Sequence, residues 1–228
     1  MSGLFRCFAG GLAAAGLLMG WSSAGAAMLY NNGTLNGGVG GFTIGGYGGD
    51  YAVSDSFTLG EVSVVTGFDF GVWTSVGDVV STVDWGIATT SNNFTNFIAS
   101  GTASVINGSP TLTSYYGTAY DDSTDAALIG DIDLSVGTYY LVLQNAVVAN
   151  GDPVYWDESD GLSTAMSNII GSLANYTHQP ASGSEAFQVF GTDDSDAPEP
   201  ASWALMLVGL AGLGASLRGN RGTRGAGA

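Results

Sequence analysis

The sequence predicts an all-β fold, a β-sandwich of jelly-roll-like type, preceded by a signal peptide and followed by one C-terminal transmembrane helix. Glycine accounts for 37 of the 228 residues, well above its usual share of about 7%. Short apolar runs recur at intervals of roughly 8–15 residues, bounded by Gly, Ser, Thr and Asn, which is typical of sheet proteins with many turns. The sequence shows no long amphipathic helix and no fixed-period repeat, so a solenoid is disfavoured.

Alternation of apolar and polar residues defines the clearest strands. Val83, Trp85 and Ile87 share one face of a strand over 81–88, which is the period of two that a half-buried strand requires. In the segment 61–72 a bulge is expected at Gly67. Its apolar residues are expected on a common face: Val62, Val64, Phe68, Phe70 and Val72.

The remaining strands follow from apolar runs between turn residues. The segments 126–134 and 138–146 resemble the two arms of a hairpin, and 165–173 is expected to be a short helix or an irregular loop. The other predicted strands are 28–30, 37–49, 51–59, 94–106 (one strand or two), 112–120, 154–156 and 185–190. The predicted domain spans 28–191, and an acidic linker follows at 192–197.

The first residues predict export. Residues 1–27 have the order of a signal peptide, with Arg6, then a short apolar run, then small residues suited to signal peptidase at Ala24-Gly25-Ala26 or one residue later. Cys7, the single cysteine, lies inside this segment, so disulfides do not stabilise the exported domain.

The charge of the body is entirely negative. Of the 20 acidic residues only Glu199 lies beyond Pro198, while the four arginines (Arg6, Arg218, Arg221 and Arg224) lie at the two ends. The segment from Met28 to Pro198 therefore has 19 acids and neither lysine nor arginine. Such a surface repels nucleic acid, because nucleic-acid binding depends on Lys and Arg at the phosphates.

The C-terminal segment has the features of a membrane anchor. An uncharged stretch at 201–217 begins near Trp203 and is close to the minimum length of about 17 residues for a spanning helix. The basic end 218–228 follows with Arg218, Arg221 and Arg224, as expected on the cytoplasmic side. Pro198, Glu199 and Pro200 precede the stretch.

This order of triplet, apolar helix and basic end resembles the PEP-CTERM sorting tail of Gram-negative bacteria over 198–228. The resemblance implies that an exosortase, a membrane peptidase, removes the tail near the triplet, so that the helix anchors the protein only transiently. The same tail is also labelled an ice-binding protein C-terminal domain. The body has too few and too irregular threonines for an ice-binding face, such as Thr111 and Thr113.

Four sequence segments of the predicted domain also resemble the sandwich domains that often precede such tails. They are Val65–Phe70, Val83–Ile87, Gly137–Leu141 and Val154–Gly161. The resemblance of these segments implies a β-sandwich architecture and leaves the activity open.

Carboxylates are the abundant reactive groups, and two clusters are candidates for calcium. Calcium prefers several oxygen ligands, which clustered carboxylates beside a turn glycine can supply. An EF-hand pattern does not fit either cluster. The candidate ligands are Asp121, Asp122 and Asp125 in one cluster and Asp157, Glu158 and Asp160 in the other.

Aromatic residues are candidates for glycan stacking. Trp73, Tyr155 and Trp156 are the first choices, with the pair Tyr115 and Tyr116 as a further platform. Trp85 is expected in the core, because it lies on the apolar face of its strand.

Catalytic chemistry has little support. His178 is the one histidine, so the usual zinc sites cannot form, and neither H-E-x-x-H nor G-x-S-x-G occurs. We expect His178 to be a loop residue.

The sequence therefore predicts an exported, non-enzymatic bacterial protein with no cofactor other than candidate calcium. It is expected to pass transiently through the inner membrane to the cell surface or extracellular matrix, with exopolysaccharide as a partner in biofilm. The alternatives are a lectin-like glycan-binding module and a glycan-active enzyme, which would need two facing carboxylates in a cleft.

Overall fold

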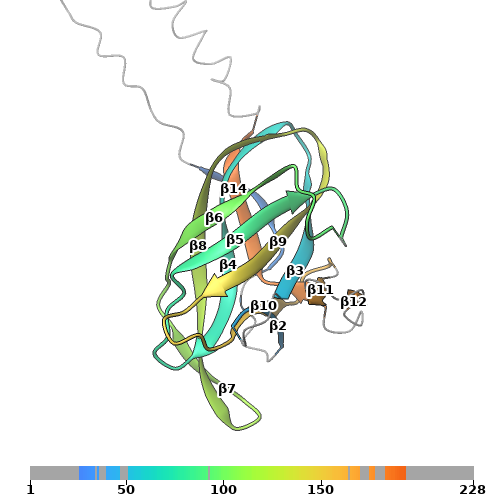
Figure 1. Ribbon diagram of the computed structural model, residues 1–228. Coiled ribbons are helices and arrows are strands. Elements are labelled where there is room, and N and C mark those ends of the chain that lie inside the picture. The colour runs from blue at the N-terminus through green and yellow to red at the C-terminus, as the bar shows by residue number, and fades with distance from the viewer. Residues whose placement is uncertain are drawn as a thin grey trace, which may run out of the picture.

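The computed structural model describes residues 26–33, 35, 40–46, 51–91, 93–163, 165–169, 175–177 and 183–193. These residues form an all-β structure, a curled sheet without helices (Figure 1). Across them, no helix has the length and apolar character needed to cross a membrane. The predicted signal peptide, apart from Ala26 and Ala27, and the predicted C-terminal helix lie outside the described residues.

Fourteen strands are formed by the described residues, and one sheet contains them all. They are β1 (Ala27–Asn31), β2 (Gly41–Gly45), β3 (Tyr51–Leu59), β4 (Ser63–Ser75), β5 (Thr82–Ala88), β6 (Ala99–Ile106), β7 (Thr111–Tyr115), β8 (Thr118–Leu134), β9 (Gly137–Val147), β10 (Val154–Ser159), β11 (Met166–Ile169), β12 (Asn175–Thr177), β13 (Ser184–Glu185) and β14 (Phe187–Asp193).

The sheet has two halves joined through β6. One half has the order β1-β14-β4-β8, and the other continues as β6-β5-β9-β3-β11-β12. Strand β6 pairs with β5 along most of its length and with β8 through Val105 and Ile106. Strand β10 pairs with β2, β4 and β13, and β7 pairs with β8.

The two halves enclose one hydrophobic core. Phe68 and Phe70 of β4 pack in it together with Phe57 of β3, Trp85 of β5 and Leu143 of β9. These side chains reach the core because alternate residues of a strand point to the same side. The predicted face of Val83, Trp85 and Ile87 is confirmed, since all three are buried there.

A bulge in β4 changes which residues of that strand point inward. The pairing with β8 shifts between Val65 and Gly67, as the bulge predicted at Gly67 requires. The extra residue reverses the alternation, so Val65 is buried with Phe68, while Val62 is exposed and Val64 is half-buried. The expectation that Val62 and Val64 share the face of Phe68 is wrong for this reason.

Three other segments differ from their predictions. The predicted hairpin of 126–134 and 138–146 does not form, because β8 pairs with β4 while β9 pairs with β3 and β5 in the other half. The predicted strand 112–120 is divided by a turn at Tyr116, whose φ is 47°, into β7 and the start of β8. Residues 166–169 form β11 rather than a helix or loop, because they pair with β3.

The two ends of the described domain lie side by side at one pole. Ala27 of β1 pairs with Gly191 of β14, and Asp193 pairs with Ser63 at the start of β4. Strand β14 thus extends to Asp193, into the segment predicted as linker. The β7–β8 hairpin lies at the opposite pole, beside Ser75 at the end of β4 (Figure 1).

Candidate functional site

The outer face of β4 presents a row of residues that points away from the core. Because Phe68, Phe70 and Val72 point inward, the alternate residues Asp69 and Trp73 point outward. Trp73 pairs with Tyr155 of β10 on one side and with Asp122 of β8 on the other. Directly paired residues in an antiparallel sheet share a face, so these side chains meet on the outer surface.

An aromatic pocket forms around Trp73. Its lining is Gly41, Trp73, Tyr115, Tyr120 and Tyr155, and its cavity volume is about 90 Å³. The Trp73 ring is 3% exposed and its centroid lies 5.5 Å from Tyr115, 5.8 Å from Tyr120 and 6.3 Å from Tyr155. Trp73 is therefore the floor, and the three half-buried tyrosines are the walls.

The pocket has an aromatic rim on the turn between β7 and β8. Tyr116 is 93% exposed, and its ring centroid lies 4.5 Å from that of Tyr115. The turn also brings Tyr120 next to β7, where it pairs with Thr113. The hairpin therefore supplies three of the rings in or beside the pocket.

Two buried carboxyl groups lie on the same face as the pocket. Asp122 is opposite Trp73, and Asp157 is two residues beyond Tyr155 on β10. Asp122 Oδ1, both oxygens of Asp157 and Trp73 Nε1 have no hydrogen-bond partner. The described residues contain no Lys, Arg or His that could form an ion pair with these groups.

Burial makes both carboxyls unusually weak acids. It raises the pKa of Asp122 to about 6. Burial and, to a lesser extent, the Asp122 and Glu158 charges raise the pKa of Asp157 to about 8, although the nearby Trp73 indole N–H and the Glu158 backbone act to lower it. At neutral pH Asp157 is therefore mainly protonated and uncharged.

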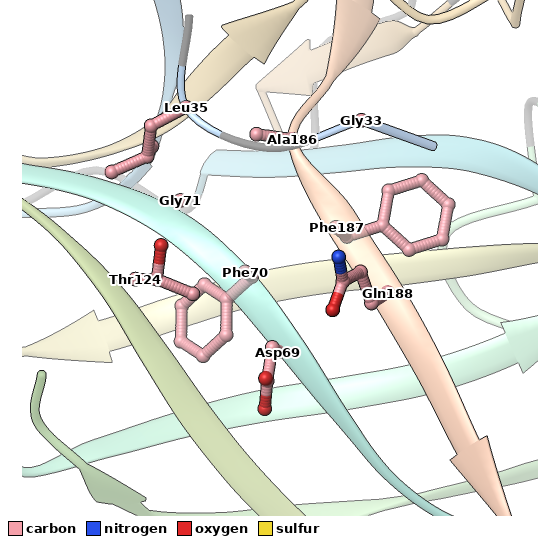
Figure 2. Close-up of a pocket in the computed structure, with 9 residues that line it drawn as sticks. All are labelled: Gly33, Leu35, Asp69, Phe70, Gly71, Thr124, Ala186, Phe187 and Gln188. Carbon is pink, nitrogen blue, oxygen red and sulfur yellow. The ribbon is translucent and has the colours of Figure 1, made fainter. Parts of the chain in front are cut away.

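A second groove continues along the same face toward the other pole. Figure 2 shows its lining, and its cavity volume is about 80 Å³. Asp69 pairs with Gln188 of β14, and Gly71 pairs with Thr124 of β8. Gly71 separates this groove from Trp73, and a Cβ added there would press on the side chains of Leu35 and Asp157. The lining residues are Gly33, Leu35, Asp69, Phe70, Gly71, Thr124, Ala186, Phe187 and Gln188.

A buried polar cluster closes one end of the core. Asn32 Nδ2 lies 3.0 Å from Asp55 Oδ2 and 2.6 Å from Ser184 Oγ, and the Ser163 hydroxyl donates to Asn32 Oδ1 at 3.0 Å. The Glu185 backbone N–H donates to Asp55 Oδ2 at 2.7 Å. These contacts connect the end of β1, β3 and β13, so the cluster has a clear structural role.

Glu185, like Asp55, is a fully buried acid beside that cluster. It pairs with Glu158 across β10 and β13, and both of its carboxyl oxygens lack a hydrogen-bond partner. Burial raises its pKa well above the ordinary value, and the charges of Asp55, Glu158 and Asp157 raise it further. The side chain is therefore expected to be protonated at neutral pH.

The predicted calcium clusters do not converge in the structure. Asp121 accepts the Gly77 N–H, and Asp125 accepts the Gly108 N–H and the Ser123 hydroxyl. Both lie on the face of β8 opposite to Asp122, because neighbouring strand residues alternate.

The second predicted calcium cluster is separated in the same way. Asp157 and Glu158 alternate on β10, and Asp160 is exposed beyond its end. Over the ranges that the structure describes, no three Asp, Glu, His or Cys side chains are grouped to hold a metal ion.

Among the predicted stacking residues, Trp73 and Tyr155 come together in the pocket, but Trp156 does not. Trp156 is 0% exposed, its Nε1–H donates to the Ala186 carbonyl at 3.0 Å, and its ring packs on Phe187. The stacking prediction for Trp156 is wrong because it alternates with Tyr155 and points into the core. Tyr120 was not predicted as a residue of the site. The turn after Tyr115, which returns the chain beside β7, is the sequence feature that indicates its place there.

Several predicted residues lie outside the described ranges. They are His178, the triplet Pro198, Glu199 and Pro200, and the basic residues Arg218, Arg221 and Arg224.

Comparison with known proteins identifies the C-terminal segment. The structure defines an all-β domain, and the comparison concerns the segment that follows it. Residues 196–221 match the family model described as the PEP-CTERM protein-sorting motif, so the C-terminal segment of the chain carries this motif. This motif implies export through the membrane to the cell surface and processing by exosortase, a membrane protein. No curated protein matches the sequence significantly.

Proposed function

We propose that this protein is a non-enzymatic component of the extracellular matrix that binds exopolysaccharide through the aromatic pocket. In this proposal signal peptidase removes residues 1–27 or a slightly shorter segment, and exosortase removes the tail near Pro198–Pro200. The remaining domain acts at the cell surface or in biofilm. The aromatic pocket around Trp73 is the observation that carries the proposal, because rings with apolar faces and polar edges suit sugar rings.

The strand order supports a jelly-roll-like β-sandwich as the scaffold. The set β1, β3, β4, β5, β6, β8, β9 and β14 divides into two groups of neighbours, β1-β14-β4-β8 and β6-β5-β9-β3. Along the chain, successive members lie in opposite halves except for the adjacent pair β5 and β6. This alternation is the connection pattern of a jelly roll, a scaffold that lectin domains use.

The polarity of the domain supports display of the pocket away from the membrane. The chain leaves the domain at Asp193, beside Ser63. Trp73 lies about 33 Å further along β4, at the usual rise of about 3.3 Å per residue. Before exosortase removes it, a tail held in the membrane therefore leaves the aromatic pocket at the distal pole, where polysaccharide is accessible.

A glycan-active enzyme is the second candidate, and the carboxyl groups of Asp122 and Asp157 are the observation that favours it. Glycosidases use two such groups on either side of the scissile bond. Both carboxyls are buried beside Trp73, however, and the pocket lining does not include them. This burial supports binding over hydrolysis.

Sorting is tested by replacing Pro198, Glu199 and Pro200 with alanine in the producing cells. Intact-mass spectra of the protein from the cell surface and the medium then report both cuts. Wild-type protein should end near the triplet and begin at Ala27 or Met28, whereas the variant should retain the tail. Equal processing and display of both proteins would contradict the role of the triplet.

Polysaccharide binding is tested with the exported protein and polysaccharide extracted from the same cells. Tyr120→Ala and Tyr115→Ala should each lower retention on immobilised polysaccharide at least fivefold, because each removes a wall of the pocket. Tyr51→Ala, on β3 in the other half of the sheet, is the matched control and should bind normally. Normal retention of both pocket variants would refute binding at this site, and release of reducing ends would favour the enzyme.

A further inference from the structure

The aromatic pocket has the composition of a cation cage. Trp73, Tyr115, Tyr120 and Tyr155 surround the space, and the face of an aromatic ring attracts a cation. The tilted rings at 5.5–6.3 Å from Trp73 present faces and edges from three strands, β4, β7 and β10, and from the start of β8. Sugar stacking alone needs one or two such faces, so the enclosure indicates a compact group.

The charged side chains around the cage are all acidic, which favours a positive group. Asp122 and Asp157 lie beside Trp73 on the same face, and three of their four carboxyl oxygens have no hydrogen-bond partner although the side chains are buried. Glu158, whose charge raises the pKa of Asp157, and Glu185, whose pKa the Asp157 charge raises, are acidic too. Within the described ranges no basic side chain is present to neutralise any of them.

A metal ion fits this environment less well than an organic cation. Calcium takes six or more oxygen ligands, whereas the pocket is walled by rings, and no three acidic side chains in the described part of the chain are grouped around one point. An alkylammonium group needs ring faces and a nearby carboxylate rather than a complete oxygen shell.

We propose that the aromatic pocket binds an organic ammonium group, with Trp73 and its three tyrosines as the cage and Asp157 and Asp122 as the counter-charges. This inference rests on the proposed function, and the source of the ammonium group is the amine of an amino sugar in the exopolysaccharide. Binding is coupled to release of a proton, because Asp157 is largely protonated in the empty site and ionises beside the cation.

The ammonium group is tested first with a pair of ligands of the same shape. Choline carries a permanent charge, and 3,3-dimethyl-1-butanol is its neutral counterpart. Calorimetry on the exported wild-type protein should show choline binding at least tenfold tighter than the alcohol at pH 8. Choline affinity should increase several-fold from pH 6 to pH 9 as Asp122 and Asp157 ionise. Equal affinities, or no dependence on pH, would overturn the proposal.

Variants assign the effect to the pocket. Asp157→Asn should lower choline affinity about tenfold and remove most of its pH dependence, and Trp73→Phe should lower the affinity while preserving the pH dependence. Asp131→Asn, an exposed carboxyl on β8, should change neither. Proton release, measured in two buffers of different ionisation enthalpy, should disappear in Asp157→Asn and persist in Asp131→Asn. Persistence of both choline binding and proton release in Asp157→Asn would refute the assignment.

A third set of ligands identifies the source of the ammonium group and separates this inference from the proposed function. A β-linked glucosamine oligomer should bind more tightly than its N-acetylated counterpart and than a neutral β-glucan oligomer. Tighter binding of choline than of the glucosamine oligomer would assign the site to quaternary ammonium compounds. Binding of native polysaccharide through the pocket without preference for amines would overturn this inference alone. Ammonium binding without polysaccharide binding would overturn the proposed function alone.

Discussion

Replacing Asp157 by asparagine should stabilise the domain at neutral and alkaline pH. Its pKa in the folded protein is raised from the ordinary value of 3.8 to about 8 by burial and by neighbouring acids. Between these values the unfolded chain has lost the proton and the folded chain retains it. Folding stability therefore falls as pH rises through this interval.

The magnitude follows from the size of the shift. One pKa unit corresponds to about 1.4 kcal/mol, so the interval between the unfolded pKa and pH 7 corresponds to roughly 4 kcal/mol. Relaxation and water entry reduce such penalties in real proteins, and we expect about 2–4 kcal/mol. Asparagine has the same shape and no charge, so Asp157→Asn removes this cost.

The assay is urea unfolding of the exported protein at pH 4, 5, 6, 7 and 8. Asp157→Asn and wild type should have similar stability at pH 4, and the variant should gain steadily until the difference reaches about 2–4 kcal/mol at pH 8. The dependence of the unfolding free energy on urea should remain the same, because the buried area is unchanged. Asp131→Asn, at an exposed position, should follow wild type throughout.

Two results would refute this reasoning. Parallel stability profiles for wild type and Asp157→Asn would mean that Asp157 does not titrate abnormally. A variant that is less stable than wild type at pH 8 would mean that the ionised carboxylate is favourably paired in the folded protein. The second result, obtained in dialysed protein, would require a cation that remains bound at this position.

The remaining predictions concern packing and can be checked by the same urea unfolding at a single pH. Trp156→Ala should lower the unfolding free energy by about 3–5 kcal/mol, because it removes a fully buried ring and its hydrogen bond. Tyr116→Ala, at an exposed position, should change it by less than about 0.5 kcal/mol. Similar losses for both variants would contradict the burial of Trp156. Gly191→Ala should cost about 1–3 kcal/mol, because its Cβ would press on the Val64 carbonyl oxygen of the neighbouring strand. Gly60→Ala, where nothing lies within 4 Å of the added carbon, should be nearly neutral, and an equal loss there would show that a general glycine effect is measured.

Local alternation predicted much of the secondary structure, and the failures arise where pairing is not local. Val83, Trp85 and Ile87 revealed their common face because the period of two depends only on the strand itself. The strands β8 and β9 follow one another with a short connection, which favours a hairpin in sequence. They separate into opposite halves, where β8 pairs with β4 and β9 pairs with both β3 and β5.

The candidate site depends on register between distant strands, which the sequence does not reveal. Trp73 and Tyr155 were each recognisable as candidates for stacking, but their direct pairing joins β4 and β10, which are about half of the domain apart in sequence. Deciding which of Tyr155 and Trp156 points outward also required the strand register, since a shift of one residue exchanges the two faces of the strand. Adjacent acids in sequence suggested calcium, but the alternation of a strand separates such neighbours.

The absence of basic residues connects the stability of this domain with its ligand preference. In most proteins a buried carboxylate is paired with Arg or Lys, but between Met28 and Pro198 the chain offers neither. Asp55 obtains hydrogen bonds from the Glu185 and Ser56 backbone N–H groups, whereas Asp157 and Glu185 receive no such bonds at their carboxyl oxygens. Only a proton or an external cation can then neutralise these two groups. Glu185 is enclosed in the core, so it retains its proton, while Asp157 lies beside a pocket that reaches the surface. A ligand cation at the pocket would therefore remove a cost that the folded protein otherwise carries, and binding should raise the unfolding free energy most strongly above pH 8.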